Sequence, residues 1–130
     1  MSASEAPRKT ILVIEDEPDV LDFIQALLQD NGYDVVSAVD GEKGLAAARS
    51  HKPDLITLDI SMPEKSGVKL YRELKGDPDL GTVPVVMVTG VLSEFKQFIS
   101  TRKQVSPPEG YVSKPIDKDL LLKTVADLIQ

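Results

Sequence analysis

The chain has 130 residues, of which 42% are hydrophobic and 28% charged, which is the composition of an ordinary soluble protein with one domain. No apolar run approaches the roughly 20 residues of a membrane span, residues 1–9 lack a secretory signal, and the absence of cysteine excludes disulfides and thiolate metal sites. The net charge of −6 argues against binding to nucleic acids. Together with the lack of a membrane span and of a secretory signal, it leads us to expect a cytoplasmic protein that binds neither nucleic acid nor membrane.

A flexible tail over residues 1–9 precedes the first predicted element, a buried strand at Thr10–Ile14 that is short, apolar and rich in β-branched residues. Pro18 suits the first turn of a helix that Asn31 and Gly32 end. Its apolar residues recur at three- and four-residue spacing: Val20, Phe23, Ile24, Leu27 and Leu28. This is the clearest amphipathic helix in the sequence.

The rest of the chain repeats this order of strand and helix. The predicted strands are Val35–Ala38, Leu55–Leu58, Pro84–Val88 and Tyr111–Ser113. The predicted helices run from Asp40 towards His51, from a cap at Ser66 with Val68, Tyr71 and Leu74 on one face, through Leu92, Phe95 and Ile99, and after Asp117 with Leu121, Val125, Leu128 and Ile129 as the apolar stripe. Strict alternation predicts an α/β fold, a doubly wound parallel sheet that helices cover on both faces.

Ligands of such sheets bind beyond the carboxyl ends of the strands, so the residues that end each strand gain importance. These residues are Glu15 and Asp16, Asp59, Thr89 and Lys114. Three carboxylates that converge repel one another and normally need a cation. A site with only oxygen ligands suits Mg²⁺, and such a site can also bind Mn²⁺.

The same residues predict phosphoryl transfer. A carboxylate such as Asp59 can attack a phosphoryl group while a cation and Lys114 neutralise charge on its oxygens and the Thr89 hydroxyl donates to one of them. Apart from the attack by the carboxylate, phosphoryl transfer requires little covalent participation by the protein, so a small domain that positions these groups suffices.

The motif set resembles that of response-regulator receiver domains in two-component signalling. The matching residues are Glu15-Asp16, Asp59 with Met62-Pro63 and Gly67, Thr89-Gly90, Tyr111 and Lys114-Pro115. The resemblance covers nearly the whole chain and implies a flavodoxin-like receiver domain over residues 10–130, with a five-stranded sheet of order 2-1-3-4-5.

The resemblance also implies a role for each residue. Asp59 would be the phosphoacceptor, Asp16 a direct metal ligand, and Glu15 a ligand that reaches the metal through water. Ser61 would coordinate the metal through its backbone carbonyl, and Lys114 would bind the phosphoryl group. Such a domain catalyses its own phosphorylation and dephosphorylation only, and is not otherwise an enzyme.

Two further expectations follow from the resemblance. The Lys114-Pro115 peptide bond is expected to be cis, a form that proline makes accessible. Thr89 and Tyr111 resemble the switch pair of the family, which would alter the surface made by the fourth helix, the fifth strand and the fifth helix.

The sequence departs from the family pattern at two places. Glu15 stands where aspartate is commoner, although it keeps an oxygen ligand, so we expect activity to survive. The interval from Thr89 to Lys114 is longer than usual and contains Pro107 and Pro108, which predicts an atypical output face.

The implied partners are a sensor histidine kinase or phosphotransfer protein, and a downstream protein target or an effector domain outside this chain. The resemblance is also compatible with a dimer that forms on phosphorylation. Lys96, Arg102 and Lys103 form either a solvated face or a docking surface for an acidic partner. His51 is expected to be an exposed side chain or a favourable charge near a helix end, not a ligand.

Two other function classes compete with this one. A degenerate receiver could act as a phosphorylation-independent interaction module, but such a module has no need of the full acidic, threonine and lysine set. A metal-dependent phosphate hydrolase is disfavoured because Ser61 stands where a second carboxylate would serve as general acid.

Overall fold

The computed structural model describes residues 8–59, 67–89 and 108–129. Its elements are β1 (Thr10–Ile14), α1 (Pro18–Asp30), β2 (Asp34–Ala38), α2 (Gly41–His51), β3 (Leu55–Leu58), α3 (Gly67–Gly76), β4 (Val85–Thr89), β5 (Gly110–Ser113) and α5 (Lys118–Ile129). The predictions for Ser61, Ser66, the helix through Leu92, Phe95 and Ile99, and the basic residues Lys96, Arg102 and Lys103 lie outside the described residues.

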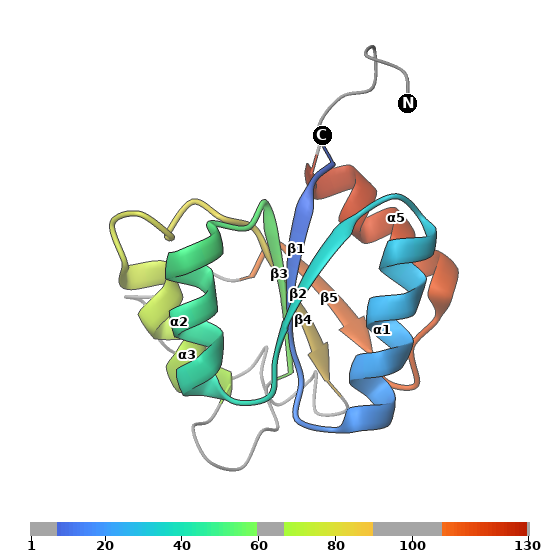
Figure 1. The fold of residues 1–130 in the computed structure, drawn as a ribbon, viewed down its shortest axis with the longest axis horizontal. Coiled ribbons are helices and arrows are strands. Elements are labelled where there is room, and N and C mark those ends of the chain that lie inside the picture. Colours follow the sequence, from blue (N-terminus) through green and yellow to red (C-terminus); the bar gives the residue numbers. More distant parts are fainter. Residues whose placement is uncertain (1–7, 60–66, 90–107, 130) are drawn as a thin grey trace.

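The five strands form one parallel sheet of order β2-β1-β3-β4-β5, as the sequence predicted (Figure 1). β1 lies between β2 and β3, where Ile14 is paired with both Ala38 and Leu58. Parallel strands require crossover connections, and α1, α2 and α3 supply those that join β1 to β2, β2 to β3 and β3 to β4. The expected fold class is therefore confirmed.

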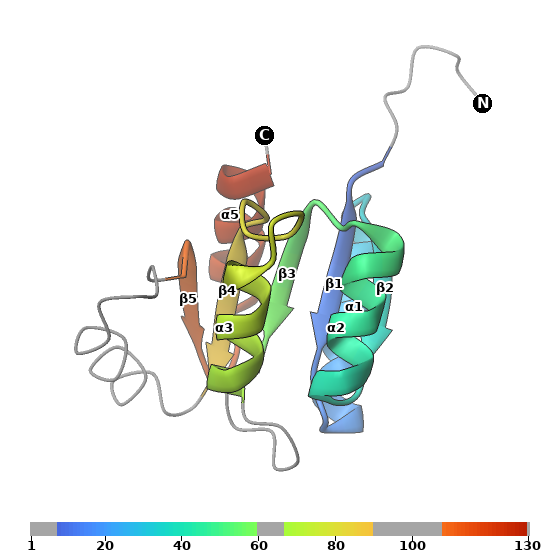
Figure 2. The ribbon, with the colours of Figure 1, turned by 90° about the vertical axis from the view of Figure 1, so that its left-hand side faces the viewer.

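Helices cover the sheet on both faces. α2 and α3 lie side by side on one face, and α1 and α5 cover the other (Figures 1 and 2). Side chains alternate between these faces along each strand, so Leu12 and Ile14 pack towards α2 and α3, whereas Ile11 and Val13 pack towards α1 and α5. All four are at most 1% exposed, which explains why the strands read as continuous apolar runs.

Helix α1 begins at Pro18 and ends before Asn31, as predicted, and Gly32 adopts a positive φ of 92°. Its buried face agrees with the predicted one at Ile24 and Leu28, which are buried, and at Val20 and Leu27, which are partly buried against the core. Leu21, Ile24 and Leu28 are the buried residues of the helix. Phe23, expected on the apolar face, is 40% exposed. Apolar residues lie around much of the circumference of α1, so the periodicity is compatible with two overlapping apolar faces. Packing on the sheet buries the face that contains Leu21 and leaves Phe23 exposed.

Helix α2 begins as its sequence predicted. Asp40 is the N-cap, and its Oδ1 accepts a hydrogen bond of 2.8 Å from the backbone N–H of Lys43. His51 lies exposed in the last turn of this helix. Among the residues described, no helix has the length and apolar character that crossing a membrane requires.

Candidate functional site

The backbone brings two buried carboxylates together at the carboxyl ends of β1 and β3. Glu15 directly follows β1 and Asp59 directly follows β3, and both residues are 1% exposed. The N–H of Asp59 donates to the carbonyl of Ile14 at 3.1 Å, and the N–H of Glu15 donates to the carbonyl of Ala38 at 3.0 Å. The sheet hydrogen bonds therefore extend one residue past each strand and fix both positions.

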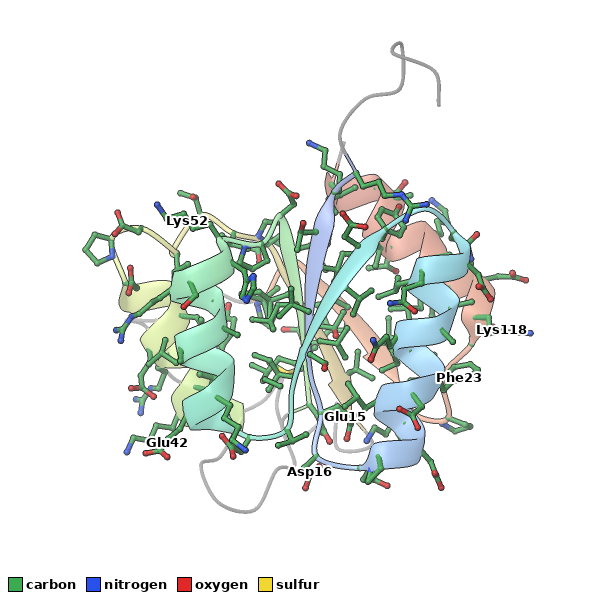
Figure 3. All side chains as sticks on the ribbon, in the orientation of Figure 1. Glu15, Asp16, Phe23, Glu42, Lys52 and Lys118 are labelled. Carbon is green, nitrogen blue, oxygen red and sulfur yellow. The ribbon has the colours of Figure 1, made fainter. Side chains whose placement is uncertain are left out.

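Four carboxylates gather at this edge of the sheet. Glu15, Asp16, Glu17 and Asp59 each contribute an oxygen atom, and these atoms lie within 4.8 Å of one another. Figure 3 shows Glu15 and Asp16 at the end of β1. We call these residues the acidic cluster. Like charges this close are unfavourable unless a cation or a proton reduces the charge.

Lys114 lies beside the acidic cluster, directly after β5. Its Nζ is 3.2 Å from Oδ2 of Asp59, 3.1 Å from Oε1 of Glu17 and 3.5 Å from Oε1 of Glu15. Burial lowers the pKa of Lys114, but the hydrogen bond to Glu17 and the charges of Asp59 and Glu15 outweigh it and raise the pKa above its usual value. The lysine is therefore a fixed positive charge against Asp59.

Glu15 is the most strongly perturbed member of the acidic cluster. Burial raises the pKa of Glu15 to about 8, and the neighbouring Asp59 carboxyl adds to this effect, while the Glu17 N–H and Lys114 oppose it. Oε2 of Glu15 accepts a hydrogen bond of 3.2 Å from the Glu17 N–H. Oε1 has no hydrogen-bond partner within the described residues. The Lys114 ammonium at 3.5 Å therefore compensates this oxygen by charge alone.

These residues fit a divalent cation. The donor atoms are carboxylate oxygens from adjacent elements, which is the ligand chemistry that Mg²⁺ prefers. The Oε1 of Glu15, which accepts no hydrogen bond within the described residues, and the proximity of four carboxylates are both features that a cation would relieve.

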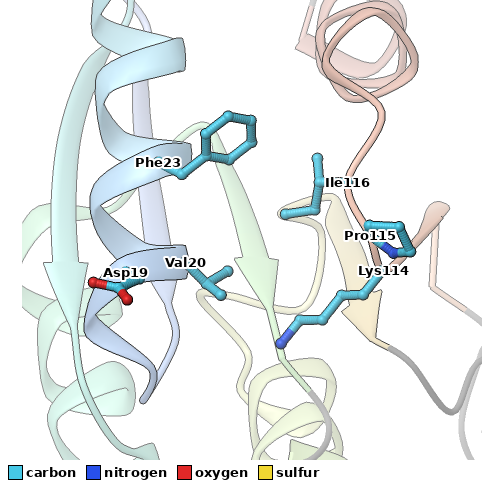
Figure 4. A pocket seen from close by; sticks show the side chains of 6 residues that line it. All are labelled: Asp19, Val20, Phe23, Lys114, Pro115 and Ile116. Carbon is cyan, nitrogen blue, oxygen red and sulfur yellow. The ribbon is translucent and has the colours of Figure 1, made fainter.

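An open groove of about 330 Å³ adjoins the site (Figure 4). It lies between α1 and the segment that joins β5 to α5, and its lining residues are Asp19, Val20, Phe23, Lys114, Pro115 and Ile116. The Lys114-Pro115 peptide bond in its wall is cis, as the resemblance implied. The lining is mainly apolar and ends at the Lys114 ammonium.

The structure brings together four of the predicted site residues, namely Glu15, Asp16, Asp59 and Lys114. Thr89 is the last residue of β4, where its backbone is paired with Ser113, so it belongs to the same edge of the sheet.

Tyr111 is half-buried in β5 and packs against the core on the α2 and α3 side. Burial raises the pKa of its phenol. The predicted functional roles of Thr89 and Tyr111 remain predictions.

One residue of the site was missed from the sequence. Glu17 is not among the predicted site residues, whereas its carboxylate belongs to the acidic cluster and contacts Lys114. Its position directly after Glu15-Asp16 was the available signal, but this signal does not tell which way the side chain points.

Comparisons with known proteins agree with this geometry. Residues 11–126 match the family model of the response regulator receiver domain. Protein PilH of Pseudomonas aeruginosa is 34% identical over 115 residues, which cover 88% of this chain and 93% of PilH. The polar-differentiation response regulator DivK of Brucella anthropi is 32% identical over 117 residues, which cover 90% of this chain and 93% of DivK.

The fold is shared with solved structures. The chemotaxis protein CheY4 of Vibrio cholerae superposes with a TM-score of 0.83 at 26% identity, over 94% of this chain and 99% of CheY4. The family match spans all the described strands and helices except the ends of β1 and α5. The chain therefore belongs to the family of response regulator receiver domains, the signalling modules of two-component systems.

Proposed function

We propose that this receiver domain is a phosphorylation switch in which Asp59 accepts a phosphoryl group from a histidine kinase or a phosphotransfer protein. One observation carries the proposal: the buried carboxylate of Asp59 lies 3.2 Å from the Lys114 ammonium and within the acidic cluster. One cationic partner is enough for a carboxylate with a purely structural role. Asp59 has Lys114 as that partner, and the other carboxylates of the acidic cluster can in addition hold a metal cation.

The proposed reaction moves one phosphoryl group. An Asp59 carboxylate oxygen attacks the phosphorus, the bond between phosphorus and the donor's imidazole nitrogen breaks, and that nitrogen keeps the bonding electron pair. Lys114 stabilises the negative charge on the transferred oxygens. The Thr89 hydroxyl, at the end of β4, is proposed to donate to one of these oxygens. The product is an aspartyl phosphate, and the donor is released as neutral imidazole from the form of phosphohistidine that carries a proton on its second ring nitrogen.

The acidic cluster is proposed to bind Mg²⁺, with Asp16 and Asp59 as direct ligands and Glu15 acting through water. The Ser61 backbone carbonyl is proposed as a further ligand. The bound ion would supply positive charge that offsets the carboxylates and the incoming phosphoryl oxygens. Receiver domains bind Mg²⁺ in an acidic pocket, and the four clustered carboxylates support the same role here.

As a signalling module, the domain acts through other proteins and not by turnover of a substrate. Donors and targets specific to this chain belong to the proposal. We propose that phosphorylation changes the surface that includes β5 and α5, through Thr89 and Tyr111. The half-buried position of Tyr111 against the core supports a ring that responds to changes inside the sheet.

The test is the intact mass of the protein after incubation with acetyl phosphate, for the wild type and for Asp59→Asn, with Mg²⁺ and with a chelator. We expect the mass of one added phosphoryl group in the wild type with Mg²⁺ only. Asp59→Asn keeps the size of the side chain but removes the nucleophilic charge, so it should gain no mass.

A wild type that folds and binds Mg²⁺ but gains no mass would contradict the proposal. The phosphorylation-independent interaction module would then be the better hypothesis. A mass gain that persists in Asp59→Asn would place the phosphoryl group elsewhere and would contradict the assignment of Asp59.

A further inference from the structure

Glu17 occupies the N-cap position of α1 without capping the helix. Ser, Thr, Asp and Asn are preferred there because their short side chains accept a hydrogen bond from a free N–H of the first turn. The Glu17 side chain makes no such bond. Its Oε1 instead accepts a hydrogen bond of 3.1 Å from the Lys114 Nζ. Helix capping therefore does not explain where this carboxylate points.

The Lys114 ammonium is shared between Glu17 and Asp59. It lies 3.1 Å from Glu17 Oε1 and 3.2 Å from Asp59 Oδ2, so the two carboxylates hold it almost equally closely. The two differ in their surroundings, since the side chain of Glu17 is 60% exposed and that of Asp59 is 1% exposed. The Glu17 N–H donates to Glu15 Oε2 at 3.2 Å, and this bond fixes the segment from which Glu17 reaches the lysine.

We propose that Glu17 is a positioning residue that competes with the phosphoryl group for Lys114 and thereby slows phosphorylation of Asp59. This inference rests on the proposed function. A phosphoryl donor brings additional negative charge to the site, and Lys114 is the cation proposed to meet it. A lysine that is hydrogen-bonded to Glu17 offers fewer of its three donors and less of its charge to that group. Glu17 thus sets the reactivity of the site without touching the phosphorus.

Removing the Glu17 charge should speed the reaction modestly. One partly exposed charge pair changes an equilibrium by about three-fold to five-fold, because water screens it. We expect Glu17→Gln to raise kcat/KM for acetyl phosphate by about this factor. The increase should arise mainly from a lower KM, since a freed Lys114 binds the phosphoryl group of the donor before and during transfer.

Two further variants separate contact from general charge. Glu17→Asp keeps the charge but shortens the side chain by one methylene group, so it should lose the 3.1 Å contact and also speed phosphorylation. Asp22→Asn removes an equal charge from the same helix at an exposed residue that does not line the groove, and no ion pair of Asp22 is found within the described residues. It should leave the rate unchanged.

The measurement is the initial rate of phosphorylation, followed by intact mass at saturating Mg²⁺ over a range of acetyl phosphate concentrations. A rate in Glu17→Gln equal to or below that of the wild type would overturn the inference and leave the proposed function intact. An equal increase in Asp22→Asn would overturn it in favour of general electrostatics. A wild type that takes no phosphoryl group would overturn the proposed function, and this inference with it.

Discussion

Phe23 is an aromatic residue that the fold leaves 40% exposed beside the site. It lines the open groove together with Val20 and Ile116, and the groove ends at the Lys114 ammonium. Exposed apolar side chains that gather in a groove mark surfaces for partner proteins, and aromatic residues often anchor them. If Asp59 takes a phosphoryl group from another protein as proposed, that protein must approach this edge of the sheet, so we predict that the donor contacts the groove.

Phe23→Ala tests this assignment at the scale of one residue. We expect transfer from the cognate phosphohistidine protein to slow by about ten-fold, because an aromatic anchor contributes roughly 1 to 2 kcal/mol to binding. The rate with acetyl phosphate should not change, since a small donor does not need the groove. Both rates can be followed by transfer of radiolabelled phosphate.

Leu120→Ala is the matched control for Phe23→Ala, because Leu120 on α5 is 46% exposed but does not line the groove. It should leave both rates unchanged. Equal slowing of both donors by Phe23→Ala would mean that the substitution disturbs the site itself, and no slowing with the protein donor would remove the groove from the interface.

At the scale of elements, a polar clamp ties α3 to the starts of β4 and β5. Lys75 on α3 places its Nζ 2.9 Å from both carboxylate oxygens of Glu109 and 3.2 Å from the carbonyl oxygen of Val83. Oε1 of Glu109 also accepts a hydrogen bond of 2.7 Å from the Val85 N–H. The Lys75 side chain is 9% exposed and that of Glu109 is 35% exposed, so the ammonium is shielded from water while the carboxylate keeps partial contact with it. The clamp fixes where β5 begins.

Lys75→Met should lower the free energy of unfolding by about 1 to 2 kcal/mol, because it removes the hydrogen bonds of a shielded ammonium to Glu109 and to the Val83 carbonyl, while the partly exposed Glu109 carboxylate can still be hydrated. Lys123→Met is the matched control, since the Lys123 side chain is 71% exposed in its ion pair with Asp127. Its effect should stay below about 0.5 kcal/mol. Urea unfolding followed by circular dichroism measures both, and equal effects of the two substitutions would contradict a shielded clamp.

The elements themselves could be predicted because each strand is an apolar run that polar or proline residues end, and the sheet order came with the family resemblance. Most of the buried face of α1 was predicted, but the choice between Phe23 and Leu21 could not be derived, since both fit the periodicity and only tertiary packing separates them. The clamp was also invisible, because Lys75 and Glu109 are 34 residues apart and no local pattern links them.

The site was largely predictable for a topological reason. Carboxyl ends of neighbouring parallel strands lie at one edge of a sheet, so Glu15, Asp59 and Lys114 had to converge once the strands were assigned. Glu17 was not predicted, because side-chain direction at an N-cap depends on the contacts available, and these come from β5, nearly a hundred residues later. The roles of Ser61, Thr89 and Tyr111 stay predictions, as do the domain limits of residues 10–130.

At the scale of the whole molecule, we expect the acidic cluster to lower the stability of the folded protein. Four carboxylates lie within 4.8 Å of one another, and Lys114 is the one cation paired with them in the described part of the chain. Two of these carboxylates are 1% exposed, so water offsets little of their repulsion. Sites arranged for chemistry commonly lower stability in this way.

Asp59→Asn should therefore stabilise the protein in the absence of divalent cations, by about 1 to 2 kcal/mol in the free energy of unfolding, because it removes one buried charge while Lys114 keeps Glu15 and Glu17 as partners. Mg²⁺ should stabilise the wild type more than the variant, since only the native wild type offers the full ligand set. Thermal unfolding with a chelator and with millimolar Mg²⁺ measures both effects.

Asp54→Asn serves as control, because Asp54 precedes the other end of β3 and accepts a hydrogen bond from the Thr10 N–H. Its response to Mg²⁺ should equal that of the wild type. If Asp59→Asn were the less stable protein in chelator, the Lys114 ion pair would outweigh the repulsion among the carboxylates, and the acidic cluster would not be a source of instability.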